Sequence, residues 1–180
     1  MRRYSSRSIR RRDFLIAGGT VAFGAALPVS TSRANPQLVE RRLIAEPARV
    51  NITGSQYPDT AVWAYSGAIP GPEIRLRQGQ RLRVEIENRL PQPTTIHWHG
   101  VRVPNAMDGV PNLTQAPIES GARFVYEFDA VDAGTYWYHP HERSFEQVGR
   151  GLFGALIIEE PQPIVVDRDV TWVLGDWRLQ

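Results

Sequence analysis

The sequence predicts an all-β domain, built as a Greek-key sandwich or barrel. Several short segments alternate apolar and polar side chains with a period of two, which is typical of half-buried strands. Glycine and proline turn signals separate these segments, and we find no long amphipathic helix pattern in the 180 residues. Many short antiparallel strands of this kind pack as two facing sheets or close into a barrel.

Residues 1–34 are expected to be a signal peptide. An arginine-rich stretch ends in Arg10-Arg11-Arg12-Asp13-Phe14-Leu15, and an apolar run extends from Phe14 to Leu27. That run is shorter than the roughly 18 residues expected for a membrane span, so we expect no stable span. Ser32-Arg33-Ala34 supplies the small residues of a cleavage site, and processing is predicted near Ala34.

The leader also resembles a twin-arginine (Tat) signal, an address read by the machinery that exports folded bacterial proteins. Paired arginines followed by x-Phe-Leu carry this resemblance, although Arg10 stands where Ser or Thr is common. The Tat export machinery is therefore an expected partner, and the expected location is periplasmic or secreted. An uncleaved signal anchor is the alternative, and it would also place the domain outside the cytoplasm.

The charge of the chain is divided unevenly between the leader and the rest. The leader holds seven of the 21 basic and one of the 19 acidic side chains, so the remainder has a formal net charge near −4. Binding phosphates requires a basic surface on the folded domain, and we therefore expect no nucleic-acid partner. The chain has no cysteine, but the 146 residues after the leader are enough for a core that needs no disulfide.

The clearest strand patterns lie at 81–87 and 123–129. Leu82, Val84 and Ile86 face one way in the first, and aromatic residues repeat the same alternation in the second. Further strands are predicted at 38–45, 48–53, 61–66, 73–77, 94–99, 134–139 and 153–159.

The end of the chain is expected to lie outside this first domain, which we place at 35–160. Pro161-Gln162-Pro163 has the composition of a linker, and the apolar segment Asp169 to Trp177 predicts another strand. We interpret 161–180 as a linker and the first strand of a truncated second domain. The alternative is that this strand completes the first sheet.

All four histidines fall in two His-x-His pairs, His97 with His99 and His139 with His141. In an extended segment residues i and i+2 share a face and lie roughly 6.5 Å apart, so each pair can offer two nitrogens to one metal site. Imidazole suits zinc, copper, iron or nickel, and the ligand type alone does not choose among them. The alternative is that the histidines are hydrogen-bonded core residues.

Both pairs are predicted at strand ends, with their neighbours packed elsewhere. His97 and His99 share a face with Thr95, while Trp98 lies on the opposite face. Pro140, between the histidines of the second pair, lacks an N–H and favours a strand terminus or edge. Two such strand ends can present four imidazoles to a common cleft.

The residues around the histidines resemble two copper-binding signatures of the laccase-like multicopper oxidases. The first consists of His97-Trp98-His99-Gly100, Asp108-Gly109 and Gln115-Ala116-Pro117-Ile118. The second consists of Gly134-Thr135-Tyr136-Trp137-Tyr138-His139-Pro140-His141, followed by Gln147 and Gly151-Leu152-Phe153-Gly154. Ile69-Pro70-Gly71-Pro72 and the Gly79-Gln80 turn are also similar to that family's first domain.

The resemblance implies tandem cupredoxin domains, the first of which donates four of eight histidines to a trinuclear copper cluster. His97 would bind the type 2 copper, and His99, His139 and His141 the type 3 pair. Asp108 matches an acidic residue that assists proton delivery; an ordinary Asp-Gly turn is the alternative. The implied function couples one-electron oxidation of an unidentified reducing substrate to reduction of dioxygen to water.

Departures from the family's pattern limit what this chain can do alone. The spacing from His141 to Gln147 is longer than in many laccases, and Arg150 replaces a common Asp, which indicates a bacterial branch. The type 1 copper needs a cysteine, and the other four histidines lie in a C-terminal His-Cys-His region. Since this chain contains neither, the missing C-terminal cupredoxin domains are expected partners and the chain alone is expected to be inactive.

Other classes of protein are alternatives to this interpretation. A small cupredoxin electron carrier is excluded, because its copper requires a cysteine. A non-catalytic exported cupredoxin-like structural or interaction protein and a stand-alone periplasmic copper-binding domain remain open. A mononuclear zinc or cupin-type enzyme could use one His-x-His pair, but the nearby Glu and later single His of cupins are missing.

Overall fold

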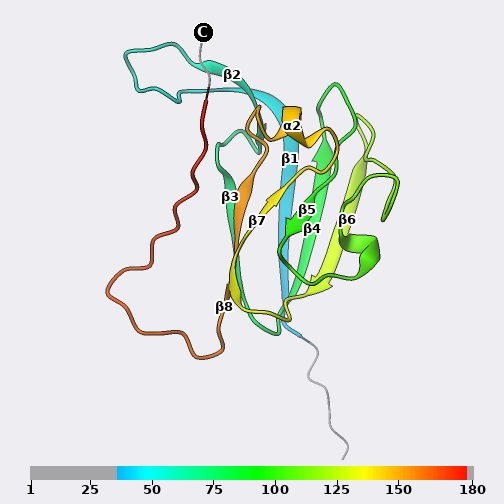
Figure 1. Cartoon of the computed structure of the whole chain (residues 1–180), viewed down its shortest axis with the longest axis vertical. Coiled ribbons are helices and arrows are strands. Elements are labelled where there is room, and N and C mark those ends of the chain that lie inside the picture. Colours follow the sequence, from blue (N-terminus) through cyan, green and yellow to red (C-terminus); the bar gives the residue numbers. More distant parts are fainter. Residues whose placement is uncertain (1–35, 178–180) are drawn as a thin grey trace, which may run out of the picture. The chain divides into compact units, whose positions relative to one another are not determined.

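The computed structural model describes residues 36–177, which lie within the compact unit Asn35–Gln180. The described residues form eight strands in two four-stranded sheets (Figure 1). The first sheet has the order β2-β1-β4-β6, made by Thr60–Tyr65, Leu38–Val50, Arg81–Asn88 and Arg123–Asp129. The second has the order β3-β8-β7-β5, made by Gly71–Arg77, Gly154–Glu159, Gly134–His139 and His97–His99. The signal peptide predicted at 1–34 lies outside the described residues.

The connectivity mixes antiparallel and parallel neighbours. Strand β1 pairs antiparallel with β2 and parallel with β4, and β3 pairs parallel with β8. The remaining pairs, β4 with β6, β5 with β7 and β7 with β8, are antiparallel. Helical structure in the described part of the chain is limited to the 3₁₀ turn η1 (Asn105–Met107) and the single turn α2 (Ser144–Gln147). The predicted all-β sandwich is therefore confirmed.

The core lies between the two sheets and follows the predicted alternation. Leu82, Val84 and Ile86 of β4 are completely buried, while the intervening charged residues face outward. Trp98 and Tyr138 from the second sheet pack into the same cluster, and Trp98 is fully buried. Each large apolar side chain buried in this way contributes about 1.5–3 kcal/mol to the stability of the fold. The core therefore holds the strands that carry the histidines in place.

Two predicted strand regions differ from the observed strands by more than two residues. The segments predicted at 38–45 and 48–53 form one continuous strand, β1, that ends at Val50. The strand predicted at 94–99 is shortened to β5, because the N–H of Ile96 donates to the Tyr126 hydroxyl (2.8 Å) instead of to a neighbouring strand. Thr94 is left with an isolated bridge to Ile118.

Residues 161–177, here called the tail, differ from expectation as well. After β8 the tail turns back along the domain toward the end that carries the β1–β2 turn (Figure 1). The strand predicted from Asp169 to Trp177 is not formed within 161–177, since a strand requires a backbone partner and none pairs with this segment among the described residues. The division of the chain into domains stays a prediction. Among the helices of residues 36–177, none is long and apolar enough to cross a membrane.

Candidate metal centre

The register between β5 and β7 brings the two histidine pairs together. His97 lies directly opposite His139, and His99 lies opposite Trp137. Trp98, between the first two histidines, points into the core opposite Tyr138. The alternation of strand side chains therefore places the imidazoles on the other face of the same short ladder.

Three of the histidines converge on one point. One ring nitrogen each from His97, His99 and His139 lies within 4.8 Å of the other two. The closest approach joins Nδ1 of His99 to Nε2 of His139 at 3.3 Å. Two nitrogens that bind one tetrahedral metal at 2.0–2.1 Å are also about 3.3 Å apart, so this pair fits a shared ion.

His141 joins the group at its margin. Its ring centroid is 5.1 Å from that of His97 and 6.2 Å from that of His139, and the side chain is exposed. The backbone N–H of His141 donates to the hydroxyl of buried Thr95 (3.1 Å), which ties the second pair to the segment before the first. All four predicted ligands thus lie together, although only three converge closely.

Backbone carbonyls determine which imidazole nitrogens are free. Nδ1 of His97 is 2.8 Å from the carbonyl oxygen of Asp108, and Nδ1 of His139 is 2.9 Å from that of Pro140. A carbonyl oxygen can only accept, so both Nδ1 atoms carry the proton. The Nε2 lone pairs of His97 and His139 are left available to a metal, an arrangement common among ligating histidines.

His139 is the most enclosed of the four. It is 7% exposed, and its ring stacks on Trp137 with centroids 3.9 Å apart and planes at 21°. Burial lowers its pKa to about 4, and the neighbouring imidazoles act in the same direction. His139 is therefore neutral at pH 7, the form that binds metal.

Asp108 contacts His97 more closely through its backbone than through its carboxylate. Its Oδ1 atom is 3.4 Å from Nδ1 of His97, against 2.8 Å for its carbonyl oxygen. The following Gly109 adopts φ +76°, and a Cβ there would overlap the carbonyl of Ile96. The Asp-Gly turn seen in the sequence can approach β5 only because residue 109 has no side chain.

A buried polar clamp of Thr94 and Gln147 holds the segment that leads into β5. It was not predicted from the sequence. The Thr94 hydroxyl donates to Oε1 of Gln147 (2.7 Å), and Nε2 of Gln147 donates to the Pro93 carbonyl (2.8 Å). Both side chains are fully buried, so their polar groups require these partners. Gln147 did appear in the second motif, but nothing in its spacing indicates a partner 53 residues earlier.

The chain matches the family model described as multicopper oxidase over residues 46–163. Copper resistance protein A of Escherichia coli is 41% identical over 182 residues, which cover 93% of this chain and 29% of that protein. Multicopper oxidase MmcO of Mycobacterium tuberculosis is 34% identical over 97% of this chain and 37% of its own length. The chain thus spans little more than a third of these relatives at most.

Solved structures of copper oxidases also match this chain in sequence and fold. A multi-copper oxidase from Pseudomonas thermotolerans is 48% identical, with a TM-score of 0.68 over 71% of this chain and 31% of that one. A blue copper oxidase from Nitrosomonas europaea is 39% identical, with a TM-score of 0.66 over 71% of this chain and 41% of that one. The two-sheet fold and the family match agree: the chain belongs to the multicopper oxidase family.

Proposed function

We propose that this chain is the N-terminal cupredoxin domain of an exported oxidase that couples one-electron oxidation of a reducing substrate to reduction of dioxygen to water. The observation that carries the proposal is the convergence of histidine nitrogens where β5 meets β7, within 4.8 Å of one another. Reducing dioxygen to water takes four electrons, and copper ions held by imidazole supply that redox chemistry. This chain would contribute half of the protein ligands to the trinuclear site.

The proposed ligand roles follow the positions of the histidines. His97 would hold the type 2 copper through Nε2, since its Nδ1 is engaged by the Asp108 carbonyl. His99 and His139 would share one type 3 copper, which their 3.3 Å nitrogen separation supports. His141, whose ring centroid is 6.2 Å from that of His139, would serve the other type 3 copper.

Asp108 is proposed to move protons at the edge of the site. Its carboxylate is partly exposed, with 32% of the side chain accessible, and Oδ1 lies 3.4 Å from the His97 ring. A carboxylate in this position can take a proton from solvent and hold it at Oδ1, beside the copper ligands. The Asp108→Asn change would remove that capacity and leave the carbonyl contact to His97 in place.

The remaining parts of the proposal concern the whole protein. Residues 1–34 would direct Tat export to the periplasm or the exterior, and 161–180 would be the linker and first strand of a second cupredoxin domain. Val170, Trp172 and Leu174 alternate along the tail and are 62%, 83% and 89% exposed, which supports a strand that packs on a further layer. Because the chain has no cysteine, the type 1 copper and the docking site of the reducing substrate would lie in the C-terminal domains.

Copper titration of the purified chain tests the ligand assignment. We expect His99→Ala and His139→Ala each to weaken copper binding at least tenfold, because each removes one of the two closest nitrogens. Arg102→Ala is the matched control, since Arg102 pairs with Asp132 on the surface and offers no ligand. Unchanged copper stoichiometry and affinity in both histidine variants would contradict the assignment.

A further inference from the structure

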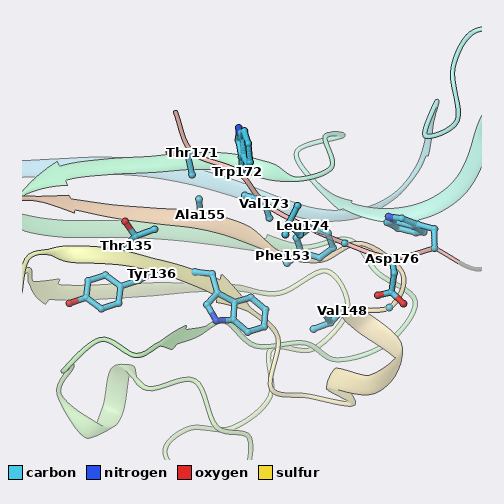
Figure 2. Close-up of a pocket in the computed structure, with 14 residues that line it drawn as sticks. Thr135, Tyr136, Val148, Phe153, Ala155, Thr171, Trp172, Val173, Leu174 and Asp176 are labelled. Carbon is cyan, nitrogen blue, oxygen red and sulfur yellow. The ribbon is translucent and has the colours of Figure 1, made fainter. Parts of the chain in front are cut away.

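A hollow lies between the tail and the outer face of the second sheet, and the histidines are not among its lining residues (Figure 2). Its volume is about 470 Å³, within the range of small-molecule sites. One wall comes from β7, β8 and Phe153, and the other from residues 171–177 of the tail. We call it the tail pocket.

The tail pocket has walls that are held in place at both ends. Arg75 of β3 binds the Asp169 carboxylate (2.8 Å), which anchors the tail to the sheet just before residues 171–177. Near the other end the tail contacts Phe153, where a Cβ on Gly175 would lie 3.1 Å from the ring. Figure 2 shows Val173 and Leu174 beside Phe153 in this arrangement.

The sheet beneath the tail is apolar on its outer side. Leu156 and Ile158 of β8 face the core, so Ala155 and Ile157 face outward, yet these two are only 4% and 8% exposed. Ala155 lies beneath the tail in Figure 2. An apolar floor under an anchored segment favours an apolar occupant.

Aromatic side chains give the pocket its chemical character. Trp137, Phe153, Trp172 and Trp177 line it, and Asp176 is the one charged residue among the described residues of the lining. Aromatic rings prefer offset-stacked or edge-to-face contacts with another ring. The single carboxylate at the wall disfavours a negatively charged ligand.

Trp137 is shared between the tail pocket and the metal centre. Its ring stacks on His139 at 3.9 Å and lies 5.0 Å from the His99 ring, and the same side chain lines the pocket. These histidine contacts restrain its orientation, so the pocket offers a preformed aromatic surface. We propose that the tail pocket is a binding site for a small, planar aromatic molecule without negative charge, in contact with Trp137.

The copper-free chain and indole as the probe test this site without reference to copper. We expect saturation-transfer NMR to show indole binding, and the ¹⁵N–¹H signals of the Trp137 and Trp177 side chains to shift on titration. Trp63 and Trp98 lie outside the pocket, and their signals should stay in place. No saturation transfer, or equal shifts at Trp98 and Trp137, would overturn the proposal, and either result would leave the copper assignment untouched.

Filling the pocket provides the second test. Ala155→Phe would place a ring in the hollow and should weaken indole binding at least tenfold, whereas Ile157→Phe, on the same face of β8 but outside the pocket lining, should change it less than twofold. Indole-3-acetate should bind more weakly than indole, because Asp176 repels its carboxylate. Equal affinity of the two β8 variants for indole would contradict the site, and the chemical-shift map of the unaltered chain decides the question if Ala155→Phe does not fold.

Discussion

Gly109 shows how a residue with no functional group of its own can orient a metal ligand. The turn at Asp108 lies against β5 because nothing projects from position 109 toward the Ile96 carbonyl. This close approach places the Asp108 carbonyl oxygen beside Nδ1 of His97. The Nε2 lone pair of His97 is then left available to a metal. The orientation of His97 therefore depends on backbone packing more than on the Asp108 carboxylate.

Gly109→Ala should destabilise the domain and weaken copper binding together. The left-handed φ alone costs about 1 kcal/mol for alanine, and the overlap with Ile96 adds a further displacement of the turn. Gly121→Ala is the matched control, because Gly121 has φ +81° but open space around its missing Cβ. Urea unfolding and copper titration of both variants measure the difference, and equal losses in the two would argue against a role for Gly109 in orienting His97.

At the scale of strands, alternation predicted which segments are extended but not how they pair. The segments at 81–87 and 123–129 were recognisable because apolar residues recur at every second position, and the structure buries Leu82, Val84 and Ile86 in β4 and Tyr126 and Phe128 in β6. The parallel pairs β1–β4 and β3–β8 could not be predicted, since register depends on contacts between residues distant in sequence. The length of β5 was overestimated because a tyrosine hydroxyl, invisible to periodicity, takes the place of a strand partner at Ile96.

Some features of the candidate site could likewise be predicted from the sequence, and others could not. The histidine pairs could be found from sequence, because i and i+2 spacing alone places two imidazoles on one strand face. The polar clamp between Thr94 and Gln147 could not, because it joins a loop to a helical turn across the fold. Whether a carbonyl or a carboxylate of Asp108 meets His97 likewise depends on the turn conformation.

Glu87 binds three arginines on the outer face of the first sheet. We expect these ion pairs to make the stability of the domain fall in acid. Hydrogen bonds from Arg89 and Arg42 lower its pKa to about 2, and Arg123 adds to the effect. Its folded pKa lies below the ordinary glutamate value of about 4.3, so this stabilisation is complete above pH 4.3 and is lost as the pH falls toward 2.

Glu87→Gln should therefore lower the unfolding temperature at pH 7, and the difference from the unaltered chain should disappear between pH 4.3 and 2. Thermal unfolding followed by circular dichroism across this range measures it. Glu127→Gln, whose side chain is 39% exposed, should have a much smaller effect because solvent screens its pairs with Arg81 and Arg83. A constant difference between the Glu87 variant and the unaltered chain down to pH 2 would contradict this account.

At the scale of the whole molecule, the proposed oxidase needs ligands that this sequence does not contain. A type 1 copper requires a thiolate, and the chain has no cysteine. We expect the genomic DNA that follows this coding sequence to encode a His-Cys-His segment, in frame or after one frameshift. Sequencing that region is the measurement, and a region without such a segment would contradict the complete-oxidase proposal but not the copper-binding role of the histidines.

The pairing of β3 with β8 bears on when the histidine site forms during synthesis of the chain. Arg75 and Glu159, which join these strands, are 84 residues apart, and β7, which carries His139, is held between β8 and β5. Loop closure over such a separation is slow compared with local folding. Because β7 pairs with both β5 and β8, we expect the histidines to be held firmly in place only after β8 has been synthesised, so a nascent chain halted before residue 154 should bind copper more weakly than the complete domain.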